Sequence, residues 1–496
     1  TRALILLYEE LTVTVETIKA LQADHFGRWK NREAIAESMI PVLGSLARER
    51  NVVVTVFGRS LVNRSVIQIL KSHRRVRMIA GDLSVVDTYP ILEIIASLDV
   101  GTCEIDIGKL AIDYRENGQG ADLRAFVAAA VQPGIGLTPQ GEPRDVVLYG
   151  FGRIGRILAR LLIEKAGNLG GLRLRAIVVR KTTDGDLQKR ASLLRRDSIH
   201  GPFEGTIAVD EENEAIIANG NFIKVIYASQ PEDIDYTAYG ISNALLIDNT
   251  GKLKDDAGLG RHLTCPGVTR VILTAPAKGT IKNLVYGVNN DTITDADTIL
   301  SAASCTTNAI TPVLKVMNDH FGILSGHVET VHSFTNDQNL IDNYHKADRR
   351  GRSAVLNMVI TETGAAKAVA KALPELLGKL TGNSIRVPTP NVSMAILSLT
   401  LEKAASKEEI NEFLRQVSLH SNLQDQIDYT NSTEVVSSDF IGSRSAGVFD
   451  AQATIVNGNR ANLYVWYDNE MGYSCQVMRI AEQVSGTHYL HLPIEG

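Results

Sequence analysis

The stretch Val146–Ile163, VVLYGFGRIGRILARLLI, decides the fold of the larger part of this chain. It reads as a hydrophobic strand, a glycine-rich turn and an amphipathic helix. Gly150, Gly152 and Gly155 have the spacing GxGxxG, which provides a tight turn, close approach to a pyrophosphate and close helix packing. The start of the helix then offers free backbone N–H groups to phosphate. The stretch therefore predicts a Rossmann domain that binds a dinucleotide.

The next expected strand, Leu172–Val179, bears on which dinucleotide binds. A site for NAD commonly ends this strand with an acidic residue that accepts hydrogen bonds from the ribose hydroxyls. The residues that follow Val179 here are Arg180, Lys181, Thr182 and Thr183. A cation with hydroxyl groups beside it would hold a 2′-phosphate, which favours NADP. Asp184 and Asp186 leave NAD open, because either could fold back as the missing acid.

A cysteine at the start of a second expected helix is the candidate nucleophile. Cys305 lies in the run SCTTN, and apolar positions over Thr306–Met317 predict the helix. The dipoles of a helix N-terminus favour thiolate over thiol. His332 ends an expected strand and would act beside the sulfur as base and later as acid.

Five runs, in this order along the chain, resemble the signatures of one enzyme family. They are SAASCTTNAITPVLKVMNDHFG, TVHSFTNDQ, TGAAKAVAKALPELLGKLTG, RVPTPNVS and WYDNEMGYS. They are similar to phosphorylating glyceraldehyde-3-phosphate dehydrogenases over about residues 145–490. The resemblance implies an α/β fold with a Rossmann domain and an α+β catalytic domain. It also implies reversible conversion of glyceraldehyde 3-phosphate, NADP or NAD, and inorganic phosphate to 1,3-bisphosphoglycerate, in glycolysis or gluconeogenesis.

The resemblance implies roles for individual residues. Cys305 would form a thioester with the substrate, assisted by His332. The residues expected to bind the dinucleotide are Gly150, Phe151, Gly152, Arg153, Ile154, Gly155, Arg180, Thr250, Gly251, Thr274 and Asn469. Those expected around the attacking phosphate are Ser304, Thr306, Arg350, Thr363 and Gly364. Those expected to hold the phosphate of the sugar are Thr335 and Arg386.

Asp337 stands where many members of this family have threonine. A carboxylate there would weaken the site for the sugar phosphate unless it pairs with an arginine, such as Arg350 or Arg352. The run HSFTNDQ resembles the NADP-using branch of the family. Asn343-Tyr344 also lacks the Leu-Pro pair of many NAD-only members. Both departures favour NADP.

The length of 496 residues allows about three domains. Residues 1–131 read as a mostly α-helical N-terminal extension, and the prolines and glycines of residues 132–143 predict a linker. The dinucleotide-binding domain would cover 144–304 and be completed by a C-terminal helix within 470–496. The catalytic domain would cover 305–469.

Two segments of the extension leave alternatives open. Asn51–Phe57, NVVVTVF, fits a short strand or the start of a buried helix. The basic run KSHRRVR at residues 71–77 reads as a solvated helix end, with an anion or nucleotide site as the alternative.

Composition narrows the function classes. A formal charge of −5 argues against general nucleic-acid binding, and no apolar run reaches the roughly 20 residues that span a membrane. Four scattered cysteines without a CxxC pair indicate a cytoplasmic protein without structural zinc or another metal. The resemblance implies a homotetramer. The alternatives are an erythrose-4-phosphate dehydrogenase and a non-catalytic binding or regulatory relative.

Overall fold

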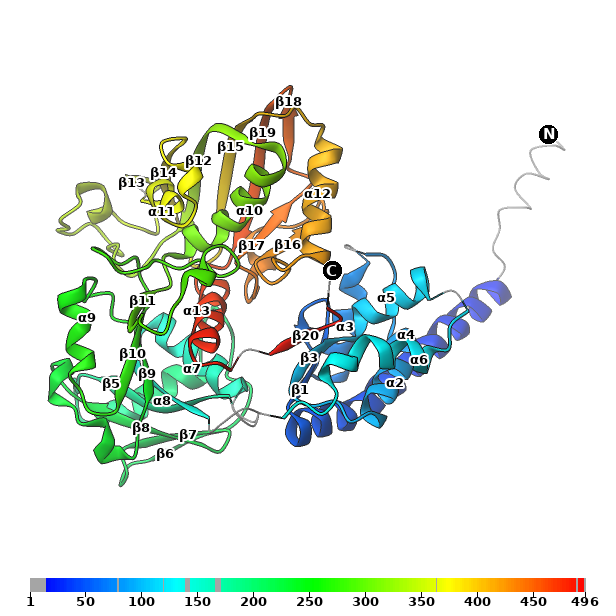
Figure 1. The fold of residues 1–496 in the computed structure, drawn as a ribbon, viewed down its shortest axis with the longest axis horizontal. Coiled ribbons are helices and arrows are strands. Elements are labelled where there is room, and N and C mark those ends of the chain that lie inside the picture. The colour runs from blue at the N-terminus through cyan, green and yellow to red at the C-terminus, as the bar shows by residue number, and fades with distance from the viewer. Residues whose placement is uncertain are drawn as a thin grey trace. The chain divides into compact units, whose positions relative to one another are not determined.

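The computed structural model describes residues 15–77, 80–118, 120–138, 143–165, 171–362, 364–487 and 489–494 (Figure 1). These residues form two compact units. The N-terminal unit contains residues up to 138 together with 489–494, and the larger unit contains the described residues from 143 to 487. No helix in the described ranges combines the length and apolarity that a membrane span requires.

The first half of the larger unit is built on an eight-stranded sheet in the order β11-β10-β9-β4-β5-β8-β7-β6. Its strands are β4 (Arg144–Tyr149), β5 (Leu172–Val179), β6 (Ile207–Asp210), β7 (Ala215–Ala218), β8 (Asn221–Tyr227), β9 (Ala244–Asp248), β10 (Val268–Leu273) and β11 (Ile299–Ser301). The six strands from β11 to β8 are parallel. Its helices are α7 (Arg153–Lys165), α8 (Asp186–Arg195), α9 (Asp256–Leu263) and α13 (Met471–Val484). The predicted strand, turn and helix are therefore confirmed.

The second half contains a sheet in the order β13-β14-β12-β15-β19-β17-β16, with β18 paired to β19. Its strands are β12 (Ile323–Ser333), β13 (Val359–Glu362), β14 (Leu380–Val387), β15 (Ser393–Leu401), β16 (Ile427–Thr430), β17 (Gly447–Asp450), β18 (Ile455–Asn457) and β19 (Arg460–Tyr467). Its helices are α10 (Cys305–Phe321), α11 (Ala365–Ala372) and α12 (Lys407–His420). Burial alternates along β15, so that one face of the sheet packs into a core with α10.

The N-terminal unit is mostly helical, as the sequence predicts, but it also contains a small sheet in the order β2-β1-β3-β20. Its strands are β1 (Val52–Val56), β2 (Arg59–Ser60), β3 (Cys103–Asp106) and β20 (Leu490–Leu492). Its helices are α2 (Val15–Arg50), α3 (Val66–Val76), α4 (Val85–Ser97), α5 (Ile107–Asn117) and α6 (Leu123–Val131). The alternative left open at residues 51–57 is thus resolved as a strand.

The C-terminal helix expected within 470–496 is found, and only residues after Val484 depart from the domain expected for them. The helix α13 ends there, and Gly486 adopts a left-handed conformation (φ 65°) that suits a helix end. Residues 490–492 then pair in parallel with β3 of the N-terminal unit. Leu492 is 2% exposed because it fills the core of that unit. The two ends of the chain therefore build one unit together.

The basic run at residues 71–77 contains a structural histidine. The ring of His73 is buried, and it contacts the Ile69 carbonyl (2.8 Å) and the Thr88 hydroxyl (2.7 Å). Burial lowers the pKa of His73. The remaining basic side chains form the end of α3, in agreement with the reading as a helix end.

Candidate functional site

Cys305 and His332 meet between a helix and the sheet of the second half. Cys305 is the first residue of α10, and Ser304 caps that helix by accepting a hydrogen bond from the Thr307 N–H (3.1 Å). His332 lies near the end of β12. The Cys305 Sγ atom is 3.5 Å from Nε2 of His332. The predicted pair is therefore in contact.

Backbone and side-chain groups hold the imidazole from its other side. Nδ1 of His332 is 2.7 Å from the Ser333 carbonyl oxygen, and Nη1 of Arg386 is 2.7 Å from the same Nδ1. Nη1 also donates to the Ser333 carbonyl (3.1 Å). For Nε2 to accept a proton from sulfur, Nδ1 must carry hydrogen and donate it to that carbonyl. In this tautomer the close contact of Nδ1 with Arg386 is not a hydrogen bond, because both nitrogens are donors.

The electrostatics of this pair differ from the sequence prediction. Burial, with the Arg386 charge beside it, lowers the pKa of His332 to about 3. Burial also raises the pKa of the Cys305 thiol, and it outweighs the Arg386 charge and the hydrogen bonds from Thr306, which lower that pKa. The direction of this shift is opposite to the acidified thiol that the sequence predicts. Both shifts favour the neutral forms of the thiol and the imidazole.

Arg386 and Arg350, both expected at phosphate groups, lie close enough for their charges to act on this pair. Asp337 accepts a hydrogen bond from the Thr335 hydroxyl and forms an ion pair with Arg350 (2.5 Å), as one of the two alternatives predicts. Arg352 pairs instead with Asp342 (2.8 Å). None of the described residues accepts a hydrogen bond from the buried Nε of Arg386, which leaves this donor for an anion.

The other described residues expected around the attacking phosphate lie at helix ends. The Thr306 hydroxyl is buried in the first turn of α10, 3.0 Å from the Tyr467 hydroxyl. Gly364 immediately precedes α11 and is exposed. Thr363 lies outside the described residues.

Asn469 is fixed by two serines. Its Oδ1 atom accepts hydrogen bonds from the Ser333 hydroxyl (2.8 Å) and the Ser393 hydroxyl (3.1 Å). Because both bonds go to the oxygen, the amide nitrogen is the end that can meet a ligand.

The neighbours of Asn469 in sequence tie this segment to the dinucleotide-binding half. Asp468 contacts His200 (2.9 Å), and Glu470 forms an ion pair with Arg153, which is the first residue of α7. Sequence reasoning missed this network. Only the fold brings these distant residues together.

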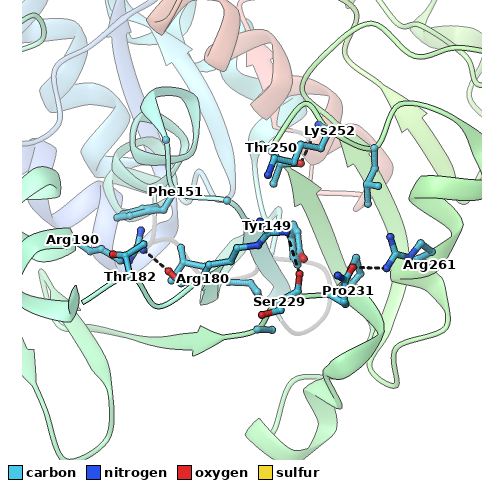
Figure 2. Close-up of a pocket in the computed structure, with 17 residues that line it drawn as sticks. Tyr149, Phe151, Arg180, Thr182, Arg190, Ser229, Pro231, Thr250, Lys252 and Arg261 are labelled. Carbon is cyan, nitrogen blue, oxygen red and sulfur yellow. Dashed lines mark hydrogen bonds between the residues drawn. The ribbon is translucent and has the colours of Figure 1, made fainter. Parts of the chain in front are cut away.

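A pocket of about 400 Å³ lies at the carboxyl ends of β4, β5 and β9 (Figure 2). This edge of a parallel sheet is where ligands bind in open α/β folds. Predicted residues that line it are Gly150, Phe151, Gly152, Arg180 and Thr250. Predicted residues that do not line it are Arg153, Ile154, Gly155, Gly251, Thr274 and Asn469. The hydroxyl of Thr274 bonds to the Asp248 carbonyl (3.1 Å).

The three glycines of the turn have different neighbours. Gly150 has φ 96°, and a Cβ atom on Gly155 would lie 2.5 Å from the Gly150 carbonyl oxygen. A Cβ atom on Gly152 would meet no described protein atom within 4 Å. Gly152 therefore leaves open space beside the pocket, which fits the close approach of a pyrophosphate.

Cations surround the pocket, and no described residue that lines it is acidic. Besides Arg180, the lining includes Arg190, Lys252 and Arg261, which sequence reasoning missed. Lys181 points into a neighbouring cavity, and its Nζ atom is 5.5 Å from the centre of the Tyr227 ring. The donor set suits an anionic nucleotide.

The two aspartates left open as ribose ligands do not line the pocket. Asp184 is exposed, whereas Asp186 is buried. The Asp186 carboxylate accepts hydrogen bonds from the Thr182 hydroxyl (2.7 Å) and from Arg190. The acid that could have read ribose hydroxyls is thus occupied within the protein.

Comparison with known proteins identifies both halves of the larger unit. Residues 144–256 match the glyceraldehyde 3-phosphate dehydrogenase NAD binding domain, and residues 304–469 match the C-terminal domain of the same family. Glyceraldehyde-3-phosphate dehydrogenase A of Escherichia coli is 39% identical over 342 residues, 68% of this chain and 98% of that protein. Glyceraldehyde-3-phosphate dehydrogenase 2 of Trichormus variabilis has the same identity and the same coverage.

A further relative extends the match into the N-terminal unit. A glyceraldehyde-3-phosphate dehydrogenase-like protein of Pseudomonas aeruginosa is 62% identical over 456 residues, 91% of this chain and 99% of that protein. An alignment of this length is longer than the larger unit, so it includes part of the N-terminal unit. The chain belongs to the glyceraldehyde-3-phosphate dehydrogenase family of oxidoreductases.

Proposed function

We propose that this protein catalyses the phosphorylating oxidation of glyceraldehyde 3-phosphate with NADP. The observation that carries the proposal is the contact of 3.5 Å between Cys305 Sγ and His332 Nε2, with the Arg386 guanidinium beside it. A nucleophile, a base and a cation for the substrate phosphate are thereby brought together.

Cys305 attacks the aldehyde carbon while Nε2 of His332 takes the thiol proton. The backbone N–H of Cys305 and the protonated imidazole then stabilise the oxyanion, and one such donor contributes about 2.7–4 kcal/mol. A bound dinucleotide supplies the hydride acceptor. The imidazolium returns its proton to the oxyanion, which gives the hydroxyl group of a hemithioacetal. Neutral His332 then removes that hydroxyl proton as the carbon loses its hydride, which leaves a thioester on Cys305. Attack by inorganic phosphate releases the acyl phosphate.

Two anion sites follow from the same residues. Arg386 and Thr335 hold the phosphate of the sugar, and the buried Nε of Arg386 supplies an additional donor. The residues assigned to inorganic phosphate are Ser304, Thr306, Arg350, Thr363 and Gly364. The N-terminus of α11 supports this assignment, because its N–H groups attract anions.

The preference for NADP is supported by the charges of the pocket. Its described lining contains four cations and no carboxylate. The residues assigned to the dinucleotide are those predicted from the sequence, with Asn469 donating from its amide nitrogen to the nicotinamide carboxamide. A carboxylate would repel the 2′-phosphate of NADP, whereas guanidinium groups bind it.

A homotetramer in the cytoplasm is part of the proposal. Leu340, Ile341, Tyr344, Leu356 and Met358 are each at least 68% exposed, and apolar side chains gathered in one segment suit a subunit interface. The four cysteines are free thiols, which fits a reducing compartment. Operation in the gluconeogenic direction would agree with the use of NADP.

The domain borders are also proposals. We assign the dinucleotide-binding domain to residues 144–304 with α13, and the catalytic domain to 305–469. The break between the two sheets of the larger unit supports this border, because α10 starts at Cys305.

The test is the rate of NADP reduction with and without inorganic phosphate. We expect phosphate-dependent turnover of glyceraldehyde 3-phosphate, abolished in Cys305→Ser and reduced about 10²–10⁴-fold in His332→Asn. Cys265→Ala, which removes a buried thiol of another core, should retain the rate. Dominant turnover of erythrose 4-phosphate without phosphate dependence would favour the alternative dehydrogenase. Near-normal rates in Cys305→Ser would refute the assignment.

A further inference from the structure

We propose that Arg190 completes, with Arg180, the binding site for the 2′-phosphate of NADP, while Arg190 and Thr182 hold Asp186 away from the ribose. This inference rests on the proposed use of NADP and names the residues responsible for it. Arg190 is the residue added to the expected dinucleotide site, since neither its position in the sequence nor the motifs indicate a ligand there.

The three residues lie together at the end of β5. Arg180 and Thr182 belong to the segment between β5 and α8, and Arg190 reaches back to it from the second turn of α8. Nη2 of Arg190 donates to the Arg180 carbonyl (2.9 Å). Figure 2 shows Arg190 and Thr182 side by side at the edge of the pocket, next to Arg180.

The end of this strand is where the adenosine ribose lies in a Rossmann fold. A group that reads the 2′ position must therefore come from the segment that follows β5. Lys181 of that segment lines the neighbouring cavity but not this pocket, whereas Arg180 lines both. Lys252 and Arg261 line the pocket from the segment after β9 and from α9, not from the segment after β5. Arg180 and Arg190 are thus the cations placed for a 2′-phosphate.

Asp186 would otherwise oppose such a ligand. Its side chain is 4% exposed, and both of its oxygens accept hydrogen bonds from Arg190. The Thr182 hydroxyl donates to the same carboxylate (2.7 Å). The charge is therefore paired and turned away from the pocket lining, so it neither repels a phosphate nor accepts from ribose hydroxyls.

Arg190 retains a donor for the ligand. Its bonds to Asp186 and to the Arg180 carbonyl use Nε and Nη2, and no described residue accepts from Nη1. The ion pair with Asp186 also fixes the guanidinium plane, so that little side-chain entropy is lost when a phosphate binds.

The experiment compares two fragments of the cofactor by calorimetry on the full-length protein. 2′,5′-ADP carries the 2′-phosphate and 5′-AMP lacks it. We expect the wild type to bind 2′,5′-ADP more tightly. Arg190→Ala should weaken 2′,5′-ADP at least tenfold and change 5′-AMP less than twofold. Arg190→Lys keeps the charge without the planar group and should give an intermediate loss.

Lys189→Ala is the matched control. Lys189 is the preceding residue of α8, contributes the same charge, and bonds to the Thr183 hydroxyl (3.2 Å) outside the pocket lining. Equal losses in Arg190→Ala and Lys189→Ala, or no loss in Arg190→Ala, would overturn the assignment of Arg190. Tighter binding of 5′-AMP than of 2′,5′-ADP by the wild type would instead refute the proposed use of NADP. If Arg190→Ala does not fold, Arg190→Lys and Arg190→Gln decide the outcome.

Discussion

Arg386 lies against His332 because the two residues are register partners on the parallel strands β14 and β12, with Arg386 Nη1 2.7 Å from His332 Nδ1. A fixed positive charge at this distance disfavours the imidazolium form. A phosphate group bound by Arg386 would offset that charge. The substrate would thereby help His332 to hold the proton it takes from Cys305.

The first prediction concerns the pH dependence of Cys305 alkylation in the cofactor-free protein. His332, with a pKa near 3, stays neutral from pH 8 to pH 5 and remains able to accept the thiol proton. Removing the cation in Arg386→Leu should raise the pKa of His332 toward its ordinary value of 6.5. Because burial, the larger cause of the shift, remains in this variant, its alkylation rate should begin to fall at a higher pH than that of the wild type, at a pH still below 6.5. Identical pH profiles for the two proteins would contradict the coupling.

Substitutions in the glycine-rich turn can separate an effect on thermal stability from an effect on dinucleotide binding. Gly155→Ala should lower the melting temperature, because its Cβ would lie 2.5 Å from a backbone oxygen that cannot move freely. Gly152→Ala should melt like the wild type, since its Cβ meets no described atom within 4 Å, yet bind the dinucleotide much more weakly. Scanning calorimetry and cofactor titration measure the two effects. Loss of binding without any loss of stability in Gly155→Ala would contradict this division.

The serines that orient Asn469 should influence cofactor binding. Ser393→Ala removes the hydrogen bond of 3.1 Å to the Asn469 oxygen, and a bond of this kind contributes about 1 kcal/mol. We expect about a fivefold weaker binding of the dinucleotide, measured by titration of fluorescence. Ser398→Ala lies farther along β15 and serves as the control. An unchanged affinity in Ser393→Ala would show that Ser333 alone fixes the amide.

The C-terminal strand should contribute to the stability of the N-terminal unit. Leu492→Ala removes a side chain that is 2% exposed and should destabilise this unit by about 2–5 kcal/mol. Ile494→Ala, at a position that is 60% exposed, should have little effect. Limited proteolysis of residues 15–138 measures the difference. Equal resistance of both variants would mean that β20 does not support the sheet.

Local patterns were sufficient to predict some helices and strands of the larger unit. The strand, turn and helix at residues 146–163 follow from apolar periodicity and glycine spacing, which act over a few neighbouring residues. The sheet of the N-terminal unit could not be predicted from such local patterns. Its strand β3 is short, and its partner β20 is separated from it by most of the chain, so no local signal announces the pairing.

The sequence by itself determined the family and the glycine-rich turn, and it predicted the contact of Cys305 with His332, because these depend on residue types at fixed spacing. Only the tertiary structure decided the directions of the pKa shifts of Cys305 and His332, the ion pair of Asp186 with Arg190 and the pairing of β20 with β3 in one sheet. The physical reason is that burial and charge pairing depend on distances in space. Residues far apart in the chain set those distances once it has folded.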